Sequence, residues 1–178
     1  EQFQPRNFGT DADDAYYVDC GITYDDVASS AMVGLDHLEG ETVYVLADGE
    51  VFDTEVVSGG AITLSSGGTT TTASTVQMGL PITVQMRTMP LSWVAQGMTI
   101  QGKTKRISEV VANWYKSGDF SIGKDSSTLQ TYTITGQTTN QDRITFPPGY
   151  SREGYVFVWQ KSAEPLTLLA VALEFNVN

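Results

Sequence analysis

Apolar and polar residues alternate in short runs along most of the chain, which is the period of a β-strand with one buried face. In the first run, Tyr16, Val18 and Cys20 fall on one face of an extended segment. Cys20 therefore lies among apolar neighbours in the pattern. We expect a buried, unreactive thiol there, because no cationic residue lies nearby in the sequence.

The following runs are separated by turn residues. Residues 42–46 are rich in β-branched and aromatic side chains, and Asp48-Gly49 follows them as a strong hairpin signal. Residues 51–57 and 61–64 predict two further strands, with a Ser-Gly-Gly turn between them. This spacing indicates a β-meander of short strands.

Residues 65–74 contain two glycines and four consecutive threonines, which predicts a flexible loop or the tip of a long hairpin. The next strand is expected over residues 75–85. Pro81 lies inside it and cannot donate to a hydrogen-bond ladder, so it predicts an edge position or a β-bulge.

Residues 105–116 fit both a helical stripe and a strand buried on one side. The β-branched and aromatic content favours a strand, with Val110, Ala112 and Trp114 on one face. Four later runs also predict strands, and the last two are expected at the centre of the core sheet. These runs are residues 129–135, 142–146, 155–159 and 166–177.

Together these signals predict an all-β fold, an antiparallel β-sandwich or barrel-like domain with short strands and Gly-rich turns. Residues 1–14 lack alternation and are expected to form an N-terminal arm or connector. Residues 15–178 are expected to form the β domain, with a possible sub-boundary near residues 65–75. No apolar run approaches the ~20 residues that a membrane helix needs, so no membrane anchor is expected.

Composition supports this class and excludes several kinds of site. Of 178 residues only 17% are charged, and Thr, Ser, Gly and Gln carry much of the polarity. One Cys and one His exclude an internal disulfide and a multi-histidine metal centre. Asp11, Asp13 and Asp14 lack the spacing of a calcium loop, so no metal site is expected.

The formal net charge of −11 is unevenly placed along the chain. Residues 1–60 hold 14 of the 21 acidic side chains and a single basic one, Arg6. Phosphate binding needs clustered Lys and Arg, so no specific nucleic-acid binding is expected. Lys103, Lys105 and Arg106 form the one basic cluster, and we interpret it as a solvated strand start or a subunit contact.

The candidate catalytic chemistry is sparse. His37 is the single histidine, and no G-x-S-x-G motif supplies a nucleophile for it. We expect His37 to be a structural hydrogen-bonding residue at a strand start. The sequence therefore predicts no catalytic residues, no cofactor-binding residues and no enzymatic activity.

One stretch carries a family resemblance. Residues 34–49, GLDHLEGETVYVLADG, followed by GGAITL at 59–64, resemble a pattern in tail proteins of tailed bacteriophages. The similar proteins are of the tail nozzle type (tail tubular or stabilisation protein) of short-tailed phages and prophages. The resemblance is poor at residues 69–72 and after Lys116. Supporting similarity lies at residues 5–10, 14–24, 78–81, 101–107 and 165–170.

The resemblance implies a non-enzymatic structural component of a phage virion tail, made in the bacterial cytoplasm, that mediates subunit assembly and DNA passage. Its partners would be copies of itself in a tail ring and neighbouring tail or adaptor proteins. Such proteins are several times longer, which implies one excised β domain. Two alternatives stay open. A carbohydrate- or receptor-binding β domain of a phage tail would present two or more exposed Trp or Tyr faces along one groove. A hydrolase would need a cleft with a close carboxylate pair.

We predict that the isolated segment is monomeric or associates weakly. Ring contacts use two different patches per subunit, and each is expected to bury less than the ~1,000 Å² of a stable interface. A net charge of −11 also makes separate copies repel at low salt. Light scattering at micromolar concentration should give a mass near 19.3 kDa. A tight, salt-resistant oligomer would contradict this prediction.

Overall fold

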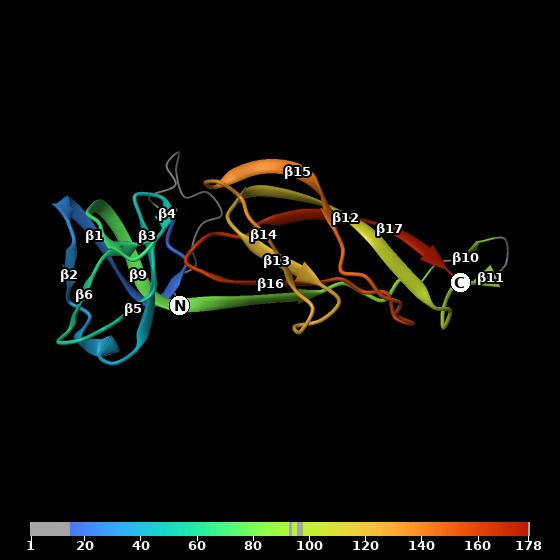
Figure 1. Cartoon of the computed structure of the whole chain (residues 1–178), viewed down its shortest axis with the longest axis horizontal. Coiled ribbons are helices and arrows are strands. Elements are labelled where there is room, and N and C mark those ends of the chain that lie inside the picture. Colours follow the sequence, from blue (N-terminus) through green and yellow to red (C-terminus); the bar gives the residue numbers. More distant parts are fainter. Residues whose placement is uncertain (1–14, 93, 96–97, 178) are drawn as a thin grey trace. The chain divides into compact units, whose positions relative to one another are not determined.

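The chain folds into two compact units in a computed structural model that describes residues 15–92, 94–95 and 98–177. Unit 1 comprises residues 15–82 and 161–165, and unit 2 comprises residues 83–160 and 166–177. The predicted arm at residues 1–14 lies outside the described residues. Figure 1 shows that both units are built from strands, which confirms the all-β antiparallel prediction.

Among the described residues, unit 1 contains eight whole strands, parts of β9 and of β16 (Phe157–Ser162), and one short 3-10 helix, η2 (Asp36–Leu38). Residues 65–75 lie within this unit. The strands are β1 (Val18–Ser29), β2 (Ala31–Val33), β3 (Thr42–Ala47), β4 (Glu50–Val51), β5 (Glu55–Val56), β6 (Ala61–Thr63), β7 (Ser65–Ser66), β8 (Thr69–Thr70) and the first part of β9 (Ala73–Arg87).

The Asp-Gly turn forms where the sequence predicts it. Leu46 pairs with Val51 and Ala47 with Glu50, so Asp48 and Gly49 make a two-residue hairpin loop. Asp48 has φ 49° and Gly49 has φ 80°, the left-handed pair that such tight turns need. The threonine-rich segment is likewise a hairpin tip, in which β7 pairs with β8.

β9 is a central strand of unit 1, because it pairs with β1 on one side and with β3 on the other. The prediction of an edge strand from Pro81 is therefore wrong. Pro81 lies at the end of the register with β1, opposite Val18, and two residues beyond Gly79, the last partner of β3. The missing N–H thus falls where the pairing with β3 has ended.

The bulge lies on the partner strand, and it changes the position of Cys20. Asp19 pairs with Leu80 and Ile22 with Met78, so Cys20 and Gly21 together oppose Gly79. Cys20 has φ 50° and is exposed, so the prediction of a buried thiol is wrong. The bulge turns the side chain off the face that Val18 buries. A Cβ at Gly79 would lie 2.6 Å from the Gly21 Cα, so the two strands approach closely at these glycines.

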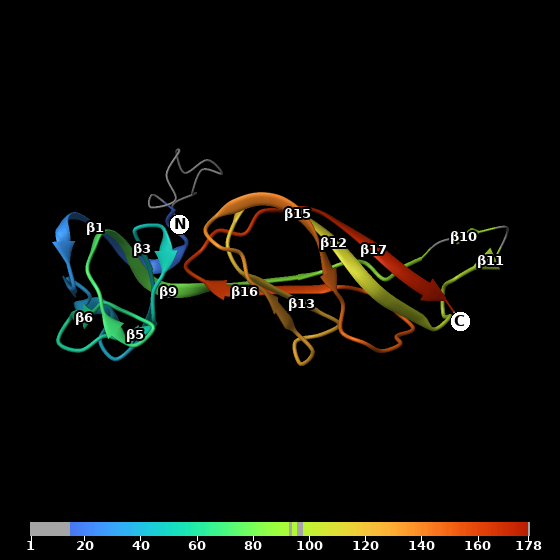
Figure 2. The same ribbon diagram turned by 45° about the horizontal axis from the view of Figure 1, so that its top comes forward.

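The strands of unit 1 curl around one main core, to which β2, β3, β6 and β9 contribute (Figure 2). Its largest fully buried side chains include Met32, Leu35, Leu64 and Met78. A smaller cluster of Ala15, Val18, Leu46 and Ala163 lies beside three half-buried tyrosines. The strict alternation that the sequence pattern predicts is not found in β3 and β9. Residues 45–47 of β3 and 76–79 of β9 are buried in unbroken runs, because both faces of these inner strands are covered.

Six strands of unit 2 form two layers, with β15, β12 and β17 over β14, β13 and β16, whereas β10 and β11 pair only with each other (Figure 1). The sheet of β14, β13 and β16 continues to the second part of β9. The strands are β10 (Val94–Ala95), β11 (Met98–Thr99), β12 (Lys105–Ser117), β13 (Phe120–Gly123), β14 (Gln130–Tyr132), β15 (Thr138–Thr145), β16 (Phe157–Ser162) and β17 (Leu168–Val177).

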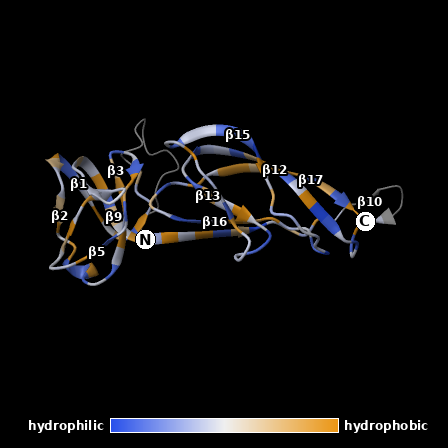
Figure 3. Cartoon of the chain, in the orientation of Figure 1, coloured by the Kyte–Doolittle hydropathy of each residue, from blue (hydrophilic) through white to orange (hydrophobic). Residues whose placement is uncertain are grey.

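β12 is the central strand of its three-stranded sheet. The strand prediction for residues 105–116 is confirmed, and Val110, Ala112 and Trp114 are all buried on one face. Figure 3 shows that this strand carries both hydrophobic and hydrophilic residues, which suits a strand with one buried face. β16 lies inside its sheet as predicted, but β17 is an edge strand, so its predicted central position is wrong.

Trp114 is the largest buried side chain of unit 2. It is 1% exposed, and its ring meets Phe120 and Tyr132 edge to face at centroid distances of 5.9 and 5.5 Å. Phe120 comes from β13, which the sequence analysis did not identify as a strand. The indole therefore joins the two layers of the sandwich.

We predict that Trp114→Ala lowers the free energy of unfolding by about 3–5 kcal/mol, because it opens a cavity between the two layers. Urea unfolding followed by far-UV circular dichroism measures this change. The matched control is Tyr115→Ala at the next position, where the side chain is 39% exposed. That variant should change the free energy by about 0.5 kcal/mol or less. Equal losses in both variants would contradict the assignment.

Candidate functional site

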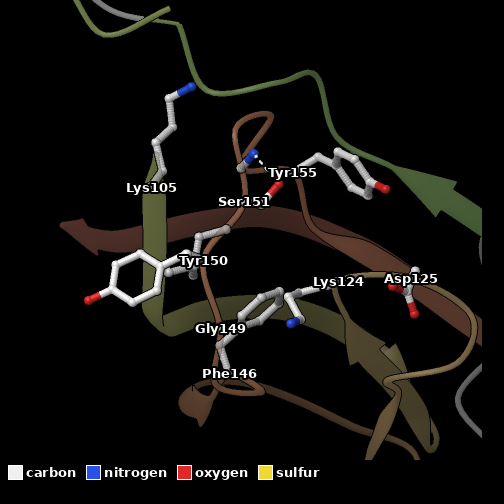
Figure 4. Close-up of a pocket in the computed structure, with 10 residues that line it drawn as sticks. Lys105, Lys124, Asp125, Phe146, Gly149, Tyr150, Ser151 and Tyr155 are labelled. Carbon is white, nitrogen blue, oxygen red and sulfur yellow. Dashed lines mark hydrogen bonds between the residues drawn. The ribbon is translucent and has the colours of Figure 1, made fainter. Parts of the chain in front are cut away.

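Unit 2 contains a pocket of about 180 Å³, here called the tyrosine pocket. It lies where the first residues of β12 meet the turn after β13 and the loop between β15 and β16 (Figure 4). Its lining combines apolar, aromatic and charged side chains, a mixture typical of small-molecule sites. The lining residues are Lys105, Ile107, Lys124, Asp125, Phe146, Gly149, Tyr150, Ser151, Gly154 and Tyr155.

The inner wall of the pocket is apolar. Ile107 and Phe146 are each 4% exposed and belong to the core of unit 2. After Phe146 the chain leaves the sheet at Pro147-Pro148-Gly149, which cannot continue a ladder. The loop of residues 149–155 then returns across the pocket and carries both tyrosines.

Lys105 holds this loop in place. Its backbone N–H donates to the Ser151 carbonyl at 2.7 Å, and Ser151 N–H donates back to the Lys105 carbonyl at 2.8 Å. Its Nζ donates to the Arg152 carbonyl at 2.7 Å, and the residue is only 2% exposed. The expectation of a solvated strand start is therefore wrong for Lys105, although Lys103 and Arg106 are exposed.

Lys124 and Asp125 follow the last residue of β13 and reach the pocket together. Lys124 Nζ donates to the Pro148 carbonyl at 3.1 Å. It lies so close to Gly149 that a Cβ there would collide with it. Asp125 Oδ1 accepts hydrogen bonds from Ser127 N–H at 2.9 Å and Ser127 Oγ at 2.6 Å. These bonds, with those from Thr128, hold the pKa of Asp125 below its ordinary value.

The two tyrosines differ in what covers their rings. Arg87 lies over the Tyr155 ring, with its guanidinium carbon 4.8 Å from the ring centroid. Tyr150 is 56% exposed. In the view of Figure 4, Ser151 lies between the two tyrosines, and Phe146 and Lys124 lie below them. The Tyr150 ring is thus the more open aromatic surface of the pocket.

The residues singled out from the sequence lie elsewhere, in unit 1. His37 Nε2 donates to the Cys20 carbonyl at 2.7 Å, which is the structural hydrogen bond expected of it. It does so from η2 and not from a strand start. The sequence analysis missed Lys124, Tyr150 and Tyr155. Pro147-Pro148-Gly149 predicts that a strand ends and a loop follows. It does not predict that Tyr150 and Tyr155 in this loop line a pocket.

Carboxylates in unit 1 fix its turns by accepting backbone hydrogen bonds. Glu39 accepts from Gly60 N–H at 2.8 Å and Gly59 N–H at 3.0 Å, which lowers its pKa. Burial acts to raise the pKa of Asp48, but hydrogen bonds from Thr75 and Ser74 outweigh it, so this pKa is also lowered. These groups stay ionised to lower pH than free carboxylates.

The charge imbalance of the sequence follows the boundary between the two units. The described residues of unit 1 carry 11 acidic side chains and one basic residue, Lys161, whereas those of unit 2 carry six acidic and eight basic ones. Eight of the 11 carboxylates are exposed. Unit 1 therefore presents a strongly acidic surface of its own.

Within the described part of the chain, no group of three or more His, Cys, Asp or Glu could hold a metal ion. No helix among the described residues has the length and hydrophobicity to span a membrane. The trio Asp11, Asp13 and Asp14 lies outside the described residues, as does Trp93. In comparisons with known proteins, no family model and no curated protein sequence matches the chain.

We predict that Glu39→Gln reduces the dependence of stability on pH. A carboxyl with a lowered folded-state pKa stabilises the fold above its unfolded pKa, about 4.3, and this contribution is lost as the pH falls through the folded value. Urea unfolding at pH 7 and at pH 3 measures the difference. Wild type should lose more stability between these pH values than the variant.

The matched control is Glu41→Gln. Glu41 lies two residues away and is exposed, and no residue that the structure describes donates to its carboxylate. Its variant should keep the wild-type dependence on pH. If both variants behave alike, the hydrogen bonds to Gly59 and Gly60 do not stabilise the fold.

Proposed function

We propose that this chain is a structural module of the virion tail of a short-tailed phage or prophage, of the nozzle type. One observation carries the proposal: the residues of the 34–49 run, which carry the resemblance, hold unit 1 together. His37 binds the Cys20 carbonyl, and Glu39 binds the Gly59 and Gly60 amides. Asp48 binds Ser74 and Thr75. The run thus connects three other segments of unit 1 by hydrogen bonds, which suits a structural part.

The acidic surface of unit 1 supports the same proposal. A channel that passes DNA must not bind the phosphate backbone, and like charge on its lining prevents this. Hydrogen bonds to backbone amides keep Glu39, Asp48 and Asp53 ionised. In the assembled tail, unit 1 would therefore face the DNA.

A carbohydrate- or receptor-binding β domain of a phage tail is the second candidate function. The tyrosine pocket favours it in part, because Tyr150 and Tyr155 line one cavity, but Arg87 covers the Tyr155 ring and of the two only Tyr150 is exposed. Trp114 contributes nothing to such a site, since it is buried in the core. The two functions are compatible, because one concerns the scaffold of unit 1 and the other concerns a loop of unit 2.

We predict that Fab fragments raised against the chain label the tail of purified particles of the phage or prophage that encodes it. Negative-stain electron microscopy reads the position of the label, and Fabs preincubated with the isolated chain are the control. Labelling around the tail axis supports the nozzle role, and labelling of peripheral spikes favours the second candidate. Labelling of the capsid, or absence of the chain from particles by mass spectrometry, would overturn both.

A further inference from the structure

We propose that unit 2 binds one extended strand of another polypeptide beside β17, with apolar side chains at alternate positions of the bound strand. The docking site, here called the open edge, consists of the unpaired side of β17 and of Val84 and Met86 on β9. This inference goes beyond the proposed tail role and does not depend on it.

The two layers of unit 2 differ in their number of strands. Among the described residues, the layer of β15, β12 and β17 has three strands, whereas residues 83–87 of β9 add a fourth to the layer of β14, β13 and β16. Tyr132 of β14 donates to Asp142 of β15, and Trp114 of β12 meets Phe120 of β13. β14 therefore lies under β15 and β13 under β12. This order places β16 under β17 and leaves residues 83–87 with no described strand over them.

Two residues of β9 are exposed as a consequence. Thr88 N–H donates to the Val156 carbonyl at 2.9 Å, so these residues lie opposite each other in the sheet. Val156 is buried in the core of unit 2, and the period of two places Met86 and Val84 on the same, core-facing side. They are nevertheless 38% and 37% exposed. The apolar face of β9 is thus incompletely covered.

β17 is open on the side next to this face. Its core-facing residues are only half-buried, although the residues of β12 opposite them are buried. Every second residue of an edge strand directs its N–H and C=O away from its partner, and no described strand pairs with these groups of β17. An extended chain would therefore meet free backbone groups and an uncovered apolar surface together. The core-facing residues are Val171, Leu173 and Phe175.

The opposite edge of the same sheet is protected against such pairing. Charged side chains on an edge strand, above all those that point inward, discourage the addition of another strand. On β15, Asp142 lies opposite the buried Ala112 and so faces inward, and Arg143 follows it. β17 has a single charged residue, Glu174, among its ten. Of the two edges, β17 is the one that accepts a strand.

The open edge fits a single strand and not a second folded copy. Neighbouring strands lie about 4.8 Å apart, so one strand beside β17 covers residues 83–87 of β9. A folded copy that added its own β15 or β17 would bring its other layer beneath that strand, where β9 already lies. A lone extended segment avoids this collision. Its side chains on the inner face must be apolar, because a charge there would be buried against Val84, Met86 and Leu173 without a partner.

A single strand buries less than the ~1,000 Å² of a stable interface. We therefore expect weak binding of a free peptide. A donor segment held nearby in the same assembly would bind far more completely, because its effective concentration is high.

The test uses the synthetic peptide Lys-Thr-Val-Thr-Val-Thr-Val-Thr-Lys, titrated into the isotope-labelled chain and followed by NMR. We expect saturable shifts in β17 and in residues 83–87, with a dissociation constant in the high micromolar to millimolar range. Amide hydrogen exchange should slow in β17 and stay unchanged in β15. A peptide of the same composition with its three valines adjacent is the control and should bind more weakly.

Two N-methylated peptides test the backbone pairing. N–H groups of alternate residues point to opposite edges of a strand. Methylation of all valine amides and methylation of all threonine amides therefore block opposite edges of the peptide. One of the two forms should lose binding and the other should keep it, because only one edge of the peptide faces β17.

Met86→Lys tests the apolar surface, and it should weaken binding at least about tenfold. Gln85→Lys is the matched control, since it adds the same charge at the next position, on the other face of the exposed strand. It should bind as wild type does. Spectra of the free variants show whether each is folded, and Val84→Lys is the second variant should Met86→Lys perturb the fold.

Absence of saturable shifts with the alternating peptide would overturn the proposal and leave the proposed tail role standing. Equal binding of both methylated peptides, or equal effects of Met86→Lys and Gln85→Lys, would overturn it as well. If the β17 amides shift with protein concentration alone and light scattering gives twice the mass of the chain, the occupant is a second copy and the assignment to a single donated strand is wrong.

Discussion

Backbone amides outside the strand ladders are the groups on which this structure depends. Many strands are only two or three residues long, so turns and loops carry a large share of the N–H groups. A buried or crowded amide without an acceptor costs about 1–3 kcal/mol, and a carboxylate is a strong acceptor. Glu39 serves Gly59 and Gly60 in unit 1, and Asp119 serves Ile134 at 2.6 Å in unit 2. Hydrogen bonds from carboxylates to turn amides thus supplement the hydrophobic core of each unit.

This constraint links composition to surface charge. Glu39, Asp48 and Asp53 accept hydrogen bonds that close turns of unit 1, so part of the acidity of this unit has a structural role. The same hydrogen bonds lower the pKa values and keep the charge in place. In unit 2 a lysine stabilises a loop in a similar way, because Lys105 Nζ donates a hydrogen bond to the Arg152 carbonyl. These structural carboxylates also contribute to the acidic surface that the proposed role in DNA passage requires.

Local sequence signals predicted most strands and turns, whereas the exposure of particular side chains depends on contacts between distant parts of the chain. The Asp48-Gly49 hairpin and the buried face of β12 follow from turn chemistry and alternation, which depend on near neighbours. The exposure of Cys20 depends on a bulge opposite Gly79, 59 positions along the chain, and no local pattern contains it. Likewise, period-two alternation with Ile107 places Lys105 on the buried side of β12. The cluster of Lys103, Lys105 and Arg106 favoured the opposite prediction, a solvated strand start.

The carboxylates that close turns differ in which segments they join. Glu39 accepts from Gly59 through one oxygen and from Gly60 through the other, and so connects two segments 20 residues apart. Asp125 accepts from Ser127 and Thr128 within its own turn, next to Lys124, whose Nζ donates to the Pro148 carbonyl. Both residues are acidic, both have lowered pKa values, and both accept from the residues of a turn. The sequence near Asp125 contains its donors, Ser127 and Thr128, whereas the donors to Glu39 lie about 20 residues away and are brought to it only by folding. The same residue type therefore fixes a local turn in unit 2 and joins distant segments in unit 1.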